Sequence, residues 1–243
     1  MHDPLQVMPF VCFPCRMLPT SALPADNSLP VAALLTLSGG FLDAFTFVGH
    51  GQVFANAMTG NIVLMGIATA AQDWEQALRH VPPLLAFIAG VFLANCLRLP
   101  RVREMVVSPA LVCLALEIVM LGVGSQLPAD FPDAWLVPGI ALVAAMQNSS
   151  FTHVGSSPYN SVMTTGNLRR SIESLFRGLT HKMTRTDLHE ARVFGLVCLC
   201  FLLGAVLGGL CTMSMDNQAL LVPVLILAVV FAICLYDARA RGQ

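Results

Sequence analysis

The chain has 243 residues, of which 56% are hydrophobic and only 11% are charged. Soluble domains carry roughly 25% charged residues, so this composition excludes an ordinary soluble fold. The net charge of −1 leaves no basic surface to neutralise phosphates, and we therefore expect no nucleic-acid partner.

Residues 1–28 precede the first long apolar segment and hold five of the 15 prolines. They contain one basic residue, Arg16, and no uninterrupted apolar core, so they do not resemble a secretory signal. We expect a disordered, proline-rich tail. Met17 lies shortly before the first span, so a start codon assigned too far upstream is a second explanation for this tail.

Eight cysteines raise the question of a metal site. Cys12 and Cys15 have C-x-x-C spacing, but a closed zinc site needs four ligands and no second pair follows. The other six lie in apolar segments, where cysteine behaves as a small hydrophobic residue. The sequence predicts no metal and no cofactor.

Long apolar segments predict an all-α, polytopic membrane helix bundle forming one domain over residues 29–243. About 20 helical residues cross a hydrocarbon layer of about 30 Å. Six segments reach this length and are predicted to span: Leu29–Gly49, His80–Leu97, Val106–Ser125, Ala134–Ser150, Val193–Met213 and Ala219–Tyr236.

A seventh apolar segment, Val53–Ala71, is interrupted by Asn56 and by the triplet Thr59-Gly60-Asn61. Its uninterrupted part, Ile62–Ala71, covers only about half of a membrane. We interpret the segment as re-entrant, dipping in and returning to the same side. A complete crossing is the alternative.

The basic residues are distributed very unevenly over the connections between these segments. In the re-entrant topology only Arg79 lies on one side, and by the positive-inside rule the other side is cytoplasmic. We therefore expect a multi-pass membrane protein with both termini in the cytoplasm. The residues assigned to the cytoplasmic side are Arg16, Arg98, Arg101, Arg103, Arg169, Arg170, Arg177, Lys182, Arg185, Arg192, Arg239 and Arg241.

An internal repeat appears when the sequence is shifted by 106 residues. The segment "VGHGQVFANAMTGN" (48–61) then aligns with "VGSSPYNSVMTTGN" (154–167), and five of fourteen positions coincide. The halves, about 29–127 and 134–237, each hold three spans, so the second half must enter the membrane inverted. Inverted repeats are typical of transporters with a site near the midplane.

The repeated Thr-Gly-Asn triplet suits a helix break at membrane depth, which is tolerated only inside protein or beside water. We predict that Thr or Asn caps the helices Ile62–Ala71 and Leu168–Leu179, whose N-termini attract anionic or carbonyl groups. Two alternatives remain. Both triplets are ordinary surface turns, or Leu168–Leu179 is a shallow amphipathic helix at the cytoplasmic interface.

Ionisable residues within spans usually face a pathway or the bundle interior. Asp43 lies in the first span and Glu117 near the middle of the third, and each is a candidate to bind a proton, a sodium ion or a solute. Gln147 and Asn148 add amide groups at the end of the fourth span. Hydrogen bonds between helices are the structural alternative for all four.

The candidate solute- or ion-binding residues come from both halves and include the repeated triplets. They are Asp43, Asn56, Thr59, Gly60, Asn61, Glu117, Gln147, Asn148, Thr165, Gly166 and Asn167.

Three segments, "GGFLDAFTFVGHGQVFANAMTGNIVLMG" (39–66), "AMQNSSF" (145–151) and "MTTGNL" (163–168), resemble the YoaK-like family of bacterial integral membrane proteins. The resemblance covers nearly all of the chain after about residue 29 and implies a multi-helix inner-membrane protein. It implies no substrate and no catalytic residues. The motif positions are Gly40, Asp43, Ala44, Phe54, Thr59, Gly60, Asn61, Gln147, Asn148, Thr165 and Gly166.

The leading functional hypothesis is a transporter or channel for a small anionic or polar solute, with a midplane site at the two triplets. A membrane assembly or sensor protein without transport is the alternative. We expect no enzyme, because the chain lacks the G-x-S-x-G and H-E-x-x-H motifs and a His-rich constellation.

Overall fold

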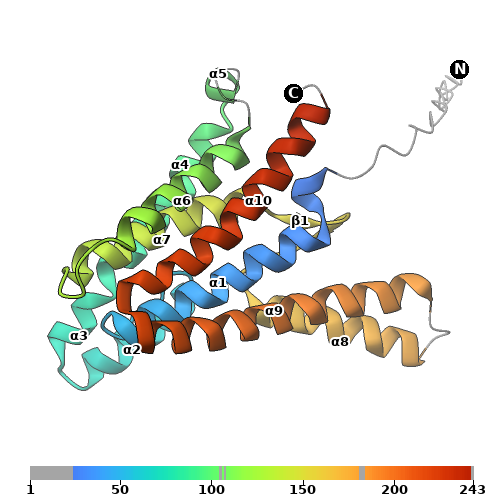
Figure 1. Cartoon of the computed structure of the whole chain (residues 1–243). Coiled ribbons are helices and arrows are strands. Elements are labelled where there is room, and N and C mark those ends of the chain that lie inside the picture. The colour runs from blue at the N-terminus through green and yellow to red at the C-terminus, as the bar shows by residue number, and fades with distance from the viewer. Residues whose placement is uncertain (1–23, 104–105, 107, 181–183, 242–243) are drawn as a thin grey trace, which may run out of the picture.

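The structure is a computed structural model that describes residues 24–103, 106, 108–180 and 184–241 (Figure 1). These residues are almost all helical, as predicted. The exception is a short antiparallel ribbon of β1 (His153–Val154) and β2 (Ser157–Pro158). Most of the predicted tail, including the Cys12–Cys15 motif and Arg16, lies outside the described residues, as does Lys182.

The helices follow one another with short connections. In chain order they are η1 (Ala25–Asn27), α1 (Leu29–Gly49), α2 (Met58–Ala70), α3 (Trp74–Arg79), α4 (Val81–Leu97), α5 (Pro100–Arg103), α6 (Pro109–Gly124), α7 (Asp133–Ser150), α8 (Thr164–Thr180), α9 (Arg185–Met215), η2 (Asp216–Leu220) and α10 (Leu221–Ala240).

Each of the six long apolar segments forms a helix close to its predicted bounds, and α1 coincides with its prediction. The start of α9 differs most, because Thr184 and Asp187 form a capping box that begins the helix several residues before its apolar part. The segment Val53–Ala71 contains only the 13-residue α2. Such a helix is roughly 20 Å long, too short to cross about 30 Å of hydrocarbon.

Three described stretches are long and apolar enough to cross a membrane: Leu29–Gly49, Trp74–Leu97 and Arg185–Ala240. The last has 56 residues and reverses direction at η2, so that α9 and α10 run toward different ends (Figure 1). Two shorter apolar helices, Met58–Ala70 and Pro109–Gly124, accompany them.

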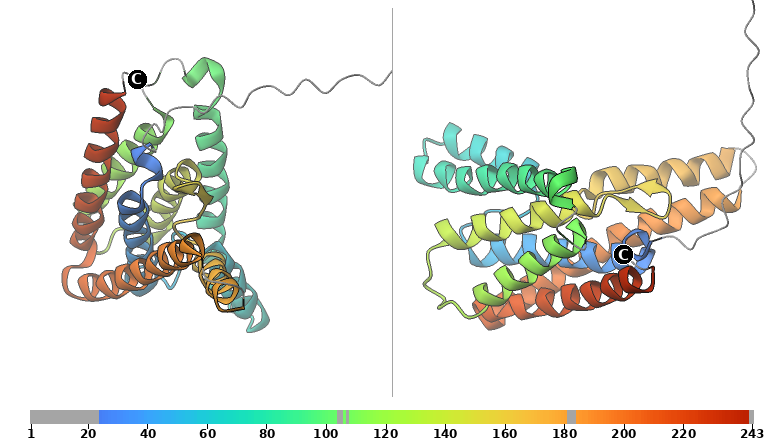
Figure 2. Two further views of the ribbon diagram at one scale, coloured as in Figure 1. Left: turned by 90° about the vertical axis from the view of Figure 1, so that its right-hand side faces the viewer. Right: turned by 90° about the horizontal axis from the view of Figure 1, so that it is seen from above.

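Helices from the two parts of the chain are paired with each other. The most extensive contacts are those of α1 with α9 and of α4 with α7. Helices α6 and α10 pack together, α6 also contacts α7, and α10 also contacts α1. In the right-hand view of Figure 2, α2 and α3 (cyan) project at one end of the bundle, and α8 and the start of α9 (orange) project at the other.

Glycines bring the paired helices into backbone contact. A Cβ atom on Gly204 would lie 2.0 Å from the carbonyl oxygen of Leu37, and one on Gly208 would lie 2.4 Å from that of Phe41. In the other pair, a Cβ on Gly90 would lie 2.3 Å from the Leu142 carbonyl oxygen. Small residues permit this approach, which is how helices gain packing energy in membranes.

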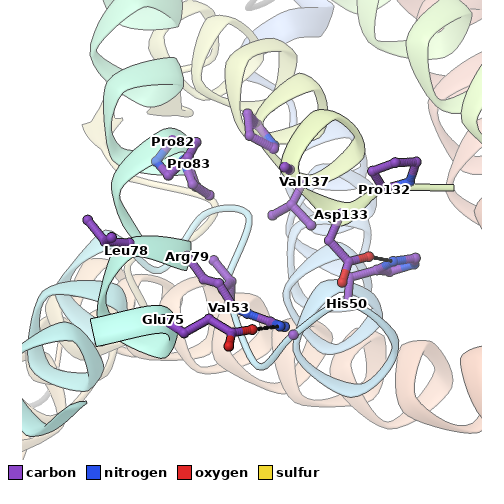
Figure 3. A pocket seen from close by; sticks show the side chains of 13 residues that line it. His50, Val53, Glu75, Leu78, Arg79, Pro82, Pro83, Pro132, Asp133 and Val137 are labelled. Carbon is purple, nitrogen blue, oxygen red and sulfur yellow. Dashed lines mark hydrogen bonds and ion pairs between the residues drawn. The ribbon is translucent and has the colours of Figure 1, made fainter. Parts of the chain in front are cut away.

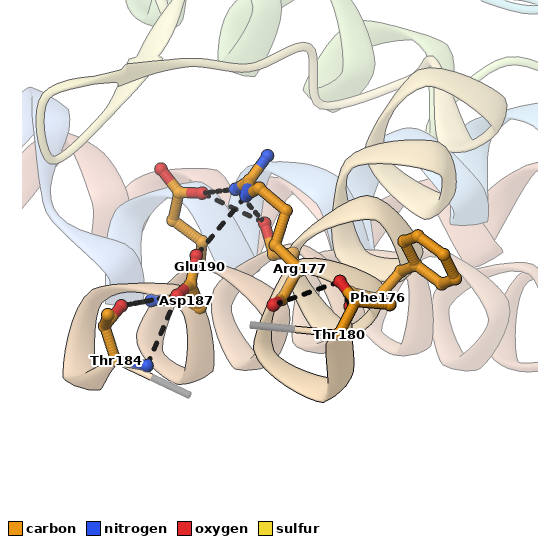
Figure 4. A network of polar contacts seen from close by, with 7 residues as sticks. Phe176, Arg177, Thr180, Thr184, Asp187 and Glu190 are labelled. Atoms are coloured by element: carbon orange, nitrogen blue, oxygen red, sulfur yellow. Dashed lines mark hydrogen bonds and ion pairs between the residues drawn. The ribbon is translucent and has the colours of Figure 1, made fainter. Parts of the chain in front are cut away.

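Polar contacts join α8 to the start of α9 (Figure 4). The Arg177 guanidinium lies 2.9 Å from Glu190 Oε2 and 3.3 Å from Asp187 Oδ1. Ser174 also donates to Glu190, at 3.0 Å. The apolar side of α8, including Phe176, is instead exposed. This agrees with the alternative of an amphipathic helix for the segment that contains the second triplet.

The two ends of the bundle differ in charge. At one end, which we call the basic end, η1 meets α10 through the Ala25 N–H and Asp237 (2.9 Å), and Arg98 of α4 donates to the Ser149 carbonyl. Arg239 also lies there, at the end of α10. At the opposite end, the α3 end, Arg79 is the only basic residue among those described (Figure 1).

We predict that Gly208→Ala lowers stability while the neighbouring Gly209→Ala does not. A methyl group on Gly208 forces α1 and α9 apart, and such overpacking costs about 1–3 kcal/mol. At about 2–4 °C per kcal/mol, the melting temperature of the purified protein should fall by several degrees. A Cβ atom on Gly209 would have no other atom within 4 Å, so its substitution should leave stability equal or higher. Equal melting temperatures for the two variants would contradict the close α1–α9 contact.

Candidate functional site

The first loop, residues 50–57, connects α1 to α2 and is held by the asparagine of the first triplet. Asn61 Oδ1 accepts from the Phe54 N–H (2.9 Å), and Asn61 Nδ2 donates to the Phe54 carbonyl (2.8 Å). Asn61 is completely buried. One amide side chain therefore satisfies both backbone groups of a loop residue that has no helical partner there.

The second loop, residues 151–163, connects α7 to α8 and is held by the asparagine of the second triplet through one such bond. Asn167 Nδ2 donates to the Asn160 carbonyl at 2.7 Å. Asn160 lies seven residues before Asn167, just as Phe54 lies seven residues before Asn61. The repeated asparagine thus makes an equivalent contact in both places.

The triplets do not break or cap the helices that follow them, which corrects the prediction. Helices α2 and α8 begin at Met58 and Thr164, so each triplet lies within the first helical turn. Thr59, Thr165 and Gly166 are exposed. Gly60 leaves room for the Phe54 ring, which a Cβ atom would approach to 2.9 Å. The helices start earlier because the asparagine bonds satisfy the loop backbone.

Asp43 connects α1 to the end of the first loop. Its side chain is buried, and Oδ1 accepts from the Asn56 N–H at 2.6 Å and from the Ala57 N–H at 3.3 Å. The second oxygen, Oδ2, is buried without a hydrogen-bond partner among the described residues. Asp43 therefore combines a fixed oxygen with a free one.

The two loops converge on Gly39. Its carbonyl accepts from Asn56 Nδ2 of the first loop at 3.4 Å. A Cβ atom at Gly39 would lie 2.8 Å from Val162 Cγ1 of the second loop. Gly39 is the middle residue of the 21-residue α1, ten residues from each end. The loops enter from opposite ends of the bundle and meet halfway along this helix.

The second loop is tied to α7 by a buried polar pair. Ser161 Oγ donates to Asn148 Oδ1 at 3.2 Å. Gln147, the preceding residue of α7, is also buried. We call Gly39, Asp43, Asn56, Asn148 and Ser161 the central site. Three of these five belong to the predicted set.

Two other buried groups lie apart from the central site. Glu117 Oε2 on α6 is buried and unpaired, and no described hydrogen bond joins Glu117 to either loop. His80, which the sequence analysis missed, lies 3.4 Å from Asn61 Oδ1 through Nδ1, while its Nε2 is buried and unpaired. The position of His80 in the sequence, shortly after the predicted re-entrant segment, was the signal that could have pointed to it.

A cavity of about 450 Å³, which we call the first vestibule, lies at the α3 end (Figure 3). The first loop, α3 with the start of α4, and the start of α7 enclose it. Its lining residues are His50, Gly51, Val53, Glu75, Leu78, Arg79, Pro82, Pro83, Pro132, Asp133, Ala134, Val137 and Pro138.

A second cavity of about 400 Å³, the second vestibule, lies beside the second loop. It is enclosed by that loop, the start of α9 and the start of α1. The elements that enclose the two vestibules therefore correspond. Each has a loop, the helices that follow α2 or α8 (α3 with the start of α4, or the start of α9), and the first helix of the other part of the chain. Its lining residues are Asn27, Ser28, Leu29, Val154, Gly155, Ser156, Ser157, Thr186, His189, Glu190, Val193 and Phe194.

In the lining of each vestibule, one contact joins the loop to the start of the first helix of the other part of the chain. In the first vestibule, His50 Nδ1 lies 2.7 Å from Asp133 Oδ1 at the start of α7 (Figure 3). In the second, the Gly155 N–H donates to the Asn27 carbonyl at 2.7 Å, just before α1. Gly155 has φ +61°, which glycine adopts without strain. We call these contacts the first and second latch.

The central site consists of polar groups that can form hydrogen bonds. In the described part of the chain, no group of three or more His, Cys, Asp or Glu residues is placed to hold a metal ion. The central site instead offers one carboxylate oxygen, amide groups and a hydroxyl group. Such groups can bind a small polar or charged molecule.

The apolar helices and their exposed apolar side chains define a transmembrane helix bundle, here with two loops that meet inside it. The chain belongs to the family described as "Protein of unknown function (DUF1275)", whose model matches residues 31–233. UPF0700 transmembrane protein YoaK of Bacillus subtilis (strain 168) is 26% identical over 199 residues, which cover 80% of this chain and 88% of that protein. The resemblance to the YoaK-like family is confirmed. No solved structure matches the chain.

We predict that Asn61→Ala destabilises the protein by releasing the first loop. Two backbone groups of Phe54 lose their partner, and each unsatisfied buried group costs about 1–3 kcal/mol. The measurement is the melting temperature, together with maleimide labelling of a Val53→Cys reporter, which should become faster. Thr59→Ala is the matched control, since Thr59 is exposed in the same helical turn. If both variants label and melt alike, Asn61 does not hold the loop.

Proposed function

We propose that this protein transports a small polar or charged solute through the central site, between the two vestibules. The observation that carries the proposal is the meeting of the two loops at Gly39, halfway along α1. Non-helical backbone at membrane depth occurs where it is buried in protein or lines an aqueous pathway. A membrane protein without a pathway has no evident need for two such loops.

We infer further that the bundle consists of two inverted halves with six spans: α1, α4, α6, α7, α9 and α10. Three correspondences support this arrangement. The asparagine contacts to residues 54 and 160 are equivalent. Helix α1 pairs with α9 as α7 pairs with α4. The two vestibules are enclosed by corresponding elements at different places in the bundle. Inverted repeats of this kind place the solute site at the interface between halves.

We also propose that the basic end faces the cytoplasm of a bacterial cell, with the first vestibule facing outward. Arg98 and Arg239 lie at the basic end, while Asp73, Glu75 and Asp133 accompany Arg79 at the α3 end. The positive-inside rule supports this orientation. Both latches are formed in the structure, and in the proposed mechanism they hold the pathway closed.

Flux into liposomes tests the proposed function. We predict that the purified full chain, reconstituted in liposomes, moves at least one member of a panel of inorganic cations, inorganic anions, organic amines, carboxylates and neutral polyols. Empty liposomes provide the background. Asn148→Ala, which removes the contact to Ser161, should reduce that flux. A complete panel without flux would favour the alternative of an assembly or sensor protein.

A reversible cross-link tests the first latch. We predict that His50→Cys combined with Asp133→Cys forms a disulfide under oxidation, because these side chains already meet at 2.7 Å. The cross-link should stop flux, and a reductant should restore it, since transport requires the first vestibule to open. Each single cysteine variant and the oxidised wild type control for the native cysteines. Flux that persists through complete cross-linking would contradict a gating role.

A further inference from the structure

The interior of the bundle contains acidic groups without basic partners. Asp43 and Glu117 are buried, whereas no Lys or Arg among the described residues is buried, and no described ion pair includes either acid. A buried carboxylate is costly unless it is paired with a cation or fully hydrogen-bonded. Among the described residues, the interior thus contains two carboxyl groups and no buried Lys or Arg to pair with them.

Asp43 is the acid that lies at the meeting point of the loops. Its Oδ1 atom is held by two backbone N–H groups, at 2.6 Å and 3.3 Å. These bonds fix the orientation of the carboxyl group. Its Oδ2 atom has no hydrogen-bond partner among the described residues although the side chain is buried. Asp43 thus has one carboxyl oxygen in fixed hydrogen bonds and one that is available to a ligand.

The start of α2 is occupied by this same carboxylate. Ala57 is the N-cap residue of α2, and its N–H donates to Asp43. A helix N-terminus attracts anions, and here the protein supplies the anion itself. An anionic solute that entered the site would be repelled by the Asp43 carboxylate. The central site therefore favours cations over the anionic solute that the sequence suggested.

We propose that Asp43 Oδ2 binds a monovalent cation, either an alkali metal ion or the ammonium group of an amine, as the charged part of what the protein transports. The inference rests on the proposed function and names the class of its solute. One carboxylate suits a single positive charge, whereas Ca²⁺ sites use several oxygen ligands, often from more than one carboxylate. Asn56 lies beside this carboxylate. Its backbone N–H donates to Asp43 Oδ1, and its side-chain amide donates to the nearby Gly39 carbonyl.

The first loop covers this site in the closed state. Asn56 and Ala57, which hold Oδ1, belong to the loop that ends at the first vestibule, where Val53 lines the cavity. A cation that reaches Oδ2 from the α3 end must therefore displace the loop or slip past it. This position connects cation binding to opening of the first vestibule.

Thermal stability of the purified full chain tests the proposal. LiCl, NaCl, KCl, methylammonium chloride and ethanolammonium chloride are titrated singly, with ionic strength held constant by N-methyl-D-glucamine chloride. A cation that binds only the folded protein raises the melting temperature in a saturable way. We expect at least one of these cations to do so, and the inorganic and organic arms distinguish the two sources of positive charge. Replacing chloride by gluconate should not change the response.

Two substitutions make the test specific. Asp43→Asn keeps an oxygen that accepts from the first loop but removes the charge, and it should weaken the apparent affinity at least about tenfold. Glu117→Gln is the matched control, because it neutralises the other buried acid with an unpaired oxygen and should leave the affinity unchanged. If Asp43→Asn does not fold, Asp43→Glu provides a second variant, with an expected change in the order of preference among the cations.

The outcomes separate this inference from the proposed function. No saturable response in the wild type, or an equal response in wild type and Asp43→Asn, overturns the cation site. Flux of a neutral or anionic solute that is unaffected by Asp43→Asn also overturns it while leaving transport intact. Cation binding that depends on Asp43, without flux of any panel member, supports the site and contradicts transport.

Discussion

Backbone polar groups inside a membrane protein must find partners within the protein, and this requirement governs the centre of the molecule. The two loops have too little regular structure to satisfy themselves. Asn61, Asn167 and Asp43 supply the missing bonds to the first or second loop, from positions on α2, α8 and α1. Each helix consequently becomes the support of a loop. The glycine contacts between paired helices then bring these supports close enough for the loops to meet.

Much of the fold could be predicted from the sequence because apolar length is a strong and local signal. Helix α1 agrees with its prediction at both ends, and the polar residues Asn56 and Asn61 correctly indicated that Val53–Ala71 forms no long helix, since only the 13-residue α2 lies within it. The helix starts were less accurate. Side chains that bond to a loop seven residues earlier allow α2 and α8 to begin sooner than a helix-capping interpretation implies. Such contacts depend on a loop path that periodicity does not encode.

The central site was predicted only in part, and the reason is again distance along the chain. Asp43 and Asn148 were evident as polar residues in apolar helices. Their partners are backbone N–H groups and Ser161, a common loop residue that carries no signal of its own. The contact between His50 and Asp133 joins residues 83 apart at the ends of two helices. Only the packing of α1 beside the start of α7 makes that pair recognisable.

The position of Gly39 has an electrical consequence. The first vestibule is lined by His50, just after α1, and the second by Leu29, the first residue of α1, so nearly the whole length of this helix lies between them. In the proposed orientation a membrane potential falls along this length, and Gly39 lies halfway along it. Moving one elementary charge through 100 mV changes its free energy by about 2.3 kcal/mol. In the proposed transport, a cation that moves from one vestibule to the other would cross this difference and one bound at Asp43 would have crossed only part of it, so the transport cycle would generate a current.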